Sequence, residues 1–117
     1  MKTTYSLLLA TSLLFTFTAC DKTDVAKGTP SCIRQRINKV TEESPCKEGA
    51  SVREYFFQGK TVYLFIPGSC IADASSEVLD EDCNTVGYLG GLWGNTQVNG
   101  LDFSTAEFKR TIWNSSR

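Results

Sequence analysis

The chain has 117 residues, with 12 Lys and Arg against 13 Asp and Glu, so its formal net charge at neutral pH is −1. This length suits one small domain, and a charge so near zero gives no general attraction to nucleic acid. The sequence contains no His, which excludes Ser–His and Cys–His catalysis and His-bearing metal sites, so we expect neither an enzyme nor a cofactor.

Charge is distributed unevenly along the chain. No Lys or Arg occurs between Lys60 and Lys109. The same span carries seven carboxylates: Asp73, Glu77, Asp80, Glu81, Asp82, Asp102 and Glu107. One part of the molecule is therefore acidic, whereas most of the cations precede it.

Residues 1–19 are typical of an export signal. Lys2 provides a short positive region, residues 7–17 are apolar, and the segment ends in the sequence FTAC at positions 17–20. The apolar stretch is too short to span a bilayer as a mature helix. Its ending resembles a bacterial lipobox, with Phe in place of the usual Leu, which implies cleavage before Cys20 and acylation of that residue. Two or three acyl chains anchor a protein stably. The alternative is an ordinary secretory peptide, with Cys20 in a disulfide.

Residues 20–29 are polar and lack periodicity, so we expect a tether leading to a single domain at residues 30–117. Ser31 is placed as an N-cap, and apolar residues then recur with helical spacing. This pattern predicts an amphipathic helix from Cys32 to about Glu42, which Pro45 ends.

The densest run of aromatic and β-branched residues predicts a hairpin with strands over 52–57 and 61–66, joined through Gln58-Gly59-Lys60. A two-residue turn places one set of side chains on a common face, which we predict to be the core: Tyr55, Phe57, Val62, Leu64 and Ile66. The opposite face carries Phe56, Tyr63 and Phe65, so it is not plainly polar and could be covered too. A three-residue loop would exchange the faces of one strand.

A second hairpin is predicted from residues 77–80 and 85–89, and a Gly-rich loop follows it. Ser104 and Glu107 have the spacing of a capping box, which predicts a helix from Thr105 to about Trp113. The predicted fold is therefore α+β: an antiparallel sheet of about four strands, with an N-terminal and a C-terminal helix packed against it, stabilised by disulfides.

Four cysteines remain once Cys20 is assigned to lipid: Cys32, Cys46, Cys70 and Cys83. An even number in an exported domain favours two disulfides. A zinc site of four thiolates is the competing interpretation, although no CxxC spacing and no His support it. The connectivity stays open. A bond between Cys32 and Cys46 is awkward across a helix, so bonds that join the helical segment to the sheet are favoured.

Two further groups of residues are candidate sites. Asp80, Asp82 and Asn84 match the first ligands of a calcium loop, but the later positions do not, and the same residue types favour ordinary turns. Tyr88 and Trp93 lie among glycines and could form an exposed recognition surface. For Trp93, the favoured prediction is that its side chain covers the sheet.

The arrangement of these motifs resembles a family of small uncharacterised lipoproteins of the Bacteroidota. The resemblance covers about residues 32–113, and the motifs that carry it are Cys32 and Ile37, V-x-x-Y-x-x-x-G-K-x-V-Y from Val52, Pro67 with Cys70, L-D-x-x-C-N from Leu79, Gly90-Gly91, and Asp102-Phe103. Ile71 stands where the resemblance implies a second Cys beside Cys70, and no Cys follows Asn84, which puts one bridge in doubt. The resemblance therefore implies a cellular compartment and the presence of a domain, but it implies no molecular activity.

The favoured function is that of an envelope lipoprotein acting as a non-enzymatic binding or structural module. Its partners would be the membrane, through the lipid, and an envelope protein or glycan. Asp21 would retain a lipoprotein in the inner membrane under enteric sorting rules, but in the Bacteroidota we favour the outer membrane. The alternative is a secreted inhibitor or immunity-type protein that blocks an enzyme, with Trp93 as a wedge.

Overall fold

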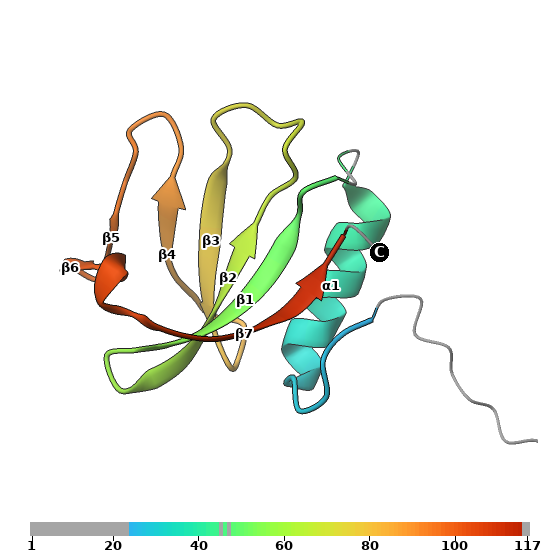
Figure 1. Ribbon diagram of the computed structural model, residues 1–117, viewed down its shortest axis with the longest axis horizontal. Coiled ribbons are helices and arrows are strands. Elements are labelled where there is room, and N and C mark those ends of the chain that lie inside the picture. The colour runs from blue at the N-terminus through green and yellow to red at the C-terminus, as the bar shows by residue number, and fades with distance from the viewer. Residues whose placement is uncertain (1–23, 45, 47, 116–117) are drawn as a thin grey trace, which may run out of the picture.

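The structure is a computed structural model that describes residues 24–44, 46 and 48–115. The predicted signal peptide and Cys20 lie outside the described residues. Within them, five antiparallel strands form one sheet in the order β4-β3-β2-β1-β7 (Figure 1). One helix and a small two-stranded sheet complete the fold. The strands are β1 (Ser51–Phe57), β2 (Lys60–Ile66), β3 (Ser75–Asp80), β4 (Thr85–Gly90), β5 (Gln97–Val98), β6 (Leu101–Asp102) and β7 (Glu107–Asn114).

The predicted N-terminal helix is present as α1 (Ser31–Glu43). It begins one residue earlier than expected, so that Ser31 lies in its first turn and does not cap it. Ile33 and Ile37 are fully buried against the sheet. Within the described residues, no helix is long and apolar enough to span a membrane.

The first predicted hairpin is confirmed with its two-residue turn. Phe57 pairs with Lys60, and Gln58 and Gly59 between them both have positive φ, at 52° and 75°. Successive left-handed residues match the right-handed twist of the two strands, which is why a Gly is favoured in such a turn. The turn sets which side chains of β1 and β2 share a face.

Both faces of this hairpin carry buried apolar side chains, although Phe56 is 42% exposed. On the predicted core face, Phe57, Val62 and Leu64 pack with Val78 of β3 and with Val98 and Phe103 of the β4–β7 connection. The Phe103 ring centroid lies 5.0 Å from that of Tyr55 and 5.1 Å from that of Phe57. The other face packs under α1, where Val52, Tyr63 and Leu79 meet Ile33 and Ile37. The sheet is therefore the middle of three layers (Figure 1).

The predicted C-terminal helix is wrong. Residues Glu107–Asn114 form strand β7, which pairs antiparallel with β1 from Ser51↔Asn114 to Phe56↔Glu107, with two register shifts. Ser104, the predicted N-cap, lies within a short 3-10 turn, η1 (Phe103–Thr105), which is capped by Asp102: its carboxylate accepts a hydrogen bond from the Ser104 N–H. Pairing with the free edge of β1 overrides the local helical pattern, because the edge offers a full ladder of hydrogen bonds.

The described part of the expected tether lies against the domain. The Ala26 N–H donates to the Ile112 carbonyl at 2.9 Å, and Arg110 donates to the Lys27 carbonyl at 2.8 Å. Arg34 donates from α1 to the Ala26 carbonyl at 3.1 Å. Residues 24–29 therefore cover part of the outer edge of β7, which would otherwise expose unpaired backbone groups.

The two predicted disulfides are present. Cys32 bonds to Cys83 and Cys46 bonds to Cys70, with Cα–Cα distances of 6.0 and 5.8 Å. The Cys32–Cys83 bond joins the helix to the sheet region, as favoured, whereas the Cys46–Cys70 bond joins two loops. The first links the start of α1 to the β3–β4 turn, and the second links the chain after α1 to the loop after β2. The Cys missing relative to the family pattern does not leave any of these four thiols unpaired.

Reduction of the disulfides is expected to destabilise the domain strongly. They close loops with sequence separations of 51 and 24 residues, and loops of such lengths contribute roughly 2–4 kcal/mol each to the free energy of unfolding. The measurement is a melting curve of a Cys20→Ser chain with and without reductant, together with a thiol count on the denatured, unreduced protein. Four free thiols, or a melting temperature that reductant leaves unchanged, would contradict the pairing.

Because of the Tyr63 phenol, we expect the free energy of unfolding to fall at alkaline pH. Burial, followed by the nearby carboxylates of Glu54 and Glu81, raises its pKa from 10.0 to about 12. The folded state thus keeps a proton that the unfolded state releases, so this part of the stability is complete below about pH 10 and is lost as the pH rises toward 12.

A pH-jump titration of tyrosinate absorbance should show a late step near pH 12 that Tyr63→Phe removes. Tyr63→Phe should also flatten the fall in unfolding free energy between pH 10 and 12. Complete ionisation of all four tyrosines near pH 10 in the folded protein would contradict this assignment.

Candidate binding surface

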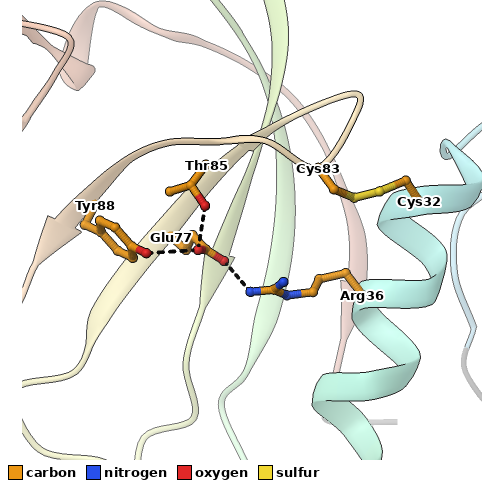
Figure 2. Close-up of polar contacts among 6 residues, drawn as sticks. All are labelled: Cys32, Arg36, Glu77, Cys83, Thr85 and Tyr88. Carbon is orange, nitrogen blue, oxygen red and sulfur yellow. Dashed lines mark hydrogen bonds and ion pairs between the residues drawn. A yellow bond between two sulfur atoms is a disulfide. The ribbon is translucent and has the colours of Figure 1, made fainter.

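Glu77 of β3 is the centre of a polar cluster on the helix side of the sheet (Figure 2). Arg36 of α1 contacts one carboxylate oxygen at 2.8 Å. The hydroxyl groups of Thr85 and Tyr88, both on β4, donate to the other oxygen at 3.0 and 3.2 Å. The cluster joins α1 to β3 and β4, close to the Cys32–Cys83 disulfide that joins the same elements.

This cluster holds side chains of α1 and β4 in place around Glu77. The Glu77 side chain is largely covered, and each of its oxygens already accepts a hydrogen bond. A charge-assisted contact with Arg36 neutralises it. The phenol of Tyr88 is held by Glu77, although half of the Tyr88 residue remains exposed. The cluster therefore holds the Tyr88 side chain on the side of Glu77 away from α1 (Figure 2).

An apolar crevice of about 160 Å³ opens next to Glu77, between α1 and the sheet. Ile37 and Val40 line it from the helix, and Phe65, Ile66 and Pro67 line it from the end of β2. Ser75, at the start of β3, completes its rim. The size of the crevice is comparable to one large side chain.

The connection from β4 to β5 forms an exposed apolar tip, which consists of Leu92 and Trp93. Leu92 is 81% exposed and Trp93 is 96% exposed. The favoured prediction that Trp93 covers the sheet is therefore wrong, whereas the predicted exposed surface at Tyr88 and Trp93 matches where these residues lie. The glycines on either side, Gly91 and Gly94, have φ of 76° and 59°, which other residues adopt only with strain.

The backbone of the tip is held by hydrogen bonds at its base. Gly90 and Asn95 exchange two backbone hydrogen bonds, at 2.7 and 3.1 Å, and the Gly94 N–H donates to the Gly91 carbonyl at 3.2 Å. The Asn95 side-chain amide donates to the carbonyls of Tyr88 and Gln97. Leu92 and Trp93 are thus presented on a preorganised turn, which lowers the entropy lost on binding.

In the acidic turn between β3 and β4, a carboxylate of the turn itself accepts the hydrogen bonds that hold it. One oxygen of Asp80 accepts hydrogen bonds from the N–H groups of Asp82 and Asn84, both at 2.9 Å, and the other accepts from the Asn84 side chain. Although desolvation opposes them, these donors hold the pKa of Asp80 below its usual value. The geometry is that of an ordinary Asx-type turn, the alternative to the calcium loop. Among the residues that the structure describes, no group of three or more Cys, Asp or Glu could hold a metal ion.

Comparison with known proteins identifies the family. The domain of unknown function DUF6970 matches residues 38–115. The chain belongs to this family. No curated protein and no solved structure gives a match. The DUF6970 region contains all seven strands, Glu77, Tyr88 and the Leu92–Trp93 tip, whereas Cys32 and Arg36 precede it.

Some residues of this surface could not be found from the sequence. Arg36 and Glu77 are 41 positions apart, and neither stands in a pattern that suggests a partner. The exposure of Leu92 could have been predicted from the sequence. Leu92 stands next to Trp93 between glycines, and a tight turn cannot bury both of these side chains.

Loss of the Glu77 contacts should reduce stability more than loss of an exposed ion pair. Glu77→Ala leaves Arg36 and two hydroxyl groups without their shared acceptor, which should cost about 1–2 kcal/mol of unfolding free energy. Glu107→Ala is the matched control, because the Glu107–Lys109 pair is largely exposed and such pairs contribute little. Denaturant unfolding measures both. Equal effects of the two substitutions would contradict a structural role of the cluster.

Proposed function

We propose that this protein is a non-enzymatic binding or structural module of the cell envelope. The observation that supports binding is the tip, where Leu92 and Trp93 are almost fully exposed on a turn with a defined backbone. Exposed apolar side chains that adjoin one another on a rigid element are typical of interaction surfaces, in which Trp is enriched. The favoured partner is an envelope protein or glycan.

The proposal includes a lipid anchor at Cys20 and a place in the outer membrane. The lipobox-like ending of the leader and the resemblance to Bacteroidota lipoproteins support it. Only a few residues separate Cys20 from Asp24, where the described chain lies beside β7. Four extended residues reach roughly 14 Å, so the domain would stay close to the membrane. The β4–β5 tip lies across the sheet from this point (Figure 1), which leaves it free to meet a partner.

The alternative function is a secreted inhibitor or immunity-type protein that blocks an enzyme. A convex apolar tip supports this alternative specifically, because such a wedge can enter the cleft of an enzyme. The two functions differ in the partner, so identification of the partner separates them.

The test is affinity purification from envelope fractions. The wild-type chain should stay in the membrane and retain a stoichiometric partner. Trp93→Ala should stay in the membrane and lose the partner, because the substitution removes the main contact. Cys20→Ser should leave the membrane.

A hydrolase as partner would favour the inhibitor, and other envelope proteins or glycans would favour the structural module. A Cys20→Ser chain that remains in the membrane would refute the anchor. A partner that survives Trp93→Ala unchanged would refute the tip as the binding element.

A further inference from the structure

The two disulfides differ in how far their cysteines are covered. Cys46 is 3% exposed, whereas its partner Cys70 is an exposed residue of the β2–β3 connection. Both members of the other bond are half-buried, and Cys83 packs against the core residues under α1. Thiol–disulfide exchange begins when a thiolate reaches one sulfur of the bond, so its rate depends on access to that sulfur. Access therefore favours reaction at Cys70 over reaction at the other three cysteines.

The surroundings of the Cys46 sulfur favour one direction of bond breaking. Gly68 approaches this sulfur so closely that a Cβ on residue 68 would collide with it, so the backbone of Gly68 shields Cys46 from a reagent. The Cys70 N–H donates a hydrogen bond to the same sulfur at 3.0 Å. A backbone donor stabilises negative charge that develops on a sulfur. Cys46 is thus placed as the leaving group, and Cys70 as the cysteine that is attacked.

Hydrogen bonds that do not involve sulfur also join the two segments. The Ser69 N–H donates to the Glu48 carbonyl at 2.8 Å, and the Ser69 hydroxyl donates to the same carbonyl at 3.3 Å. These contacts keep the two cysteines close to one another when the bond between them is open. The Cys32–Cys83 bond, which closes the longer loop, still fixes α1 to the β3–β4 turn. The arrangement favours opening and re-forming of the Cys46–Cys70 bond within a folded domain.

The segment that this bond fixes borders both parts of the candidate binding surface. At its start, Pro67 lines the apolar crevice. Near its end, the carbonyls of Asp73 and Ala74 lie 3.9 Å from Cβ atoms placed on Gly91 and Gly90, at the base of the Leu92–Trp93 tip. The β2–β3 and β4–β5 connections lie at the same end of the sheet (Figure 1). Opening of the bond removes a covalent restraint on the β2–β3 connection, so local opening beside both features becomes easier.

We propose that the Cys46–Cys70 bond is a reversible redox site, which an external dithiol reduces by attack on Cys70 while the Cys32–Cys83 bond stays intact. Reduction releases the β2–β3 connection without unfolding the domain. The inference goes beyond the proposed function, because it depends neither on the identity of a partner nor on the lipid anchor.

The exchange proceeds in two steps. A thiolate of the reductant forms a bond to the Cys70 sulfur, and the electron pair of the broken bond passes to Cys46, which then takes a proton. The second thiolate of the reductant attacks its own sulfur in this mixed disulfide, and Cys70 leaves as a thiolate and is protonated. The reductant ends as a disulfide, and the protein has gained the two electrons and two protons that the dithiol lost.

The experiment treats the purified Cys20→Ser chain with dithiothreitol under native conditions. Free thiols are alkylated at successive times, and peptide mapping identifies the labelled cysteines. Cys46 and Cys70 should be labelled at least about tenfold faster than Cys32 and Cys83, because only the first bond has an exposed member. Circular dichroism should remain that of the folded chain, and removal of the dithiothreitol in air should restore the same pair.

The matched variant carries Cys46→Ser and Cys70→Ser in the same chain. It should fold, and its remaining two cysteines should be labelled only at the slow rate. Brief reaction of the chain that retains both disulfides with glutathione, quenched by acid, should place the glutathione adduct on Cys70. Hydrogen exchange after selective reduction should rise in residues 67–74 and stay unchanged in β7.

Reduction of both bonds at the same rate, or of Cys32–Cys83 first, would overturn the proposal. So would unfolding as soon as Cys46–Cys70 opens, a double Ser variant that does not fold, a glutathione adduct on Cys46, or unchanged exchange in residues 67–74. None of these results concerns retention of a partner by the tip, so the proposed function stands or fails by its own experiment.

Discussion

The structure depends on the burial of the β1–β2 hairpin from both sides. Its turn at Gln58-Gly59 sets the register, and the register places large apolar side chains on both faces. A sheet with one apolar face needs one covering layer, but this hairpin needs two. The helix supplies the first layer. The second comes from the chain between β4 and β7, which crosses the other face and inserts Phe103 between Tyr55 and Phe57.

A small domain with a divided core has little apolar area in each layer, and covalent bonds compensate for this. Cys32–Cys83 holds the beginning of α1 to the sheet region, and Cys46–Cys70 joins the chain after α1 to the loop after β2. The Arg36–Glu77 contact acts between the same elements as the first disulfide. Helix α1 is thus held along its length, although only a few of its side chains, such as Ile33 and Ile37, enter the core.

The candidate binding surface follows from this architecture. A crevice remains between α1 and the end of β2. Because the chain must turn back from β4 to cover the other face, it makes a tight, glycine-flanked reversal there. Leu92 and Trp93, at the centre of that reversal, are the two most exposed of the large hydrophobic residues that the structure describes.

The sequence by itself determined the local features of this protein. The hairpin could be predicted because Gly59 allows the backbone of a two-residue turn and the strands alternate around it. The presence of two disulfides could be predicted because an even set of cysteines in an exported domain pairs, whereas their connectivity stayed open apart from a disfavoured bond between Cys32 and Cys46. The hairpin depends on residues that are near one another in the chain, and the disulfides could be inferred from the number of cysteines.

Only the tertiary structure decided the remainder. Residues 107–114 carry a helical capping pattern, yet the free edge of β1 makes them a strand, because a ladder of backbone hydrogen bonds outweighs a cap. The exposure of Trp93 depended on where the β4–β5 turn lies relative to the sheet, which no local pattern contains. The Arg36–Glu77 contact required α1 to lie across β3, so residues 41 positions apart meet only once the layers have been assembled.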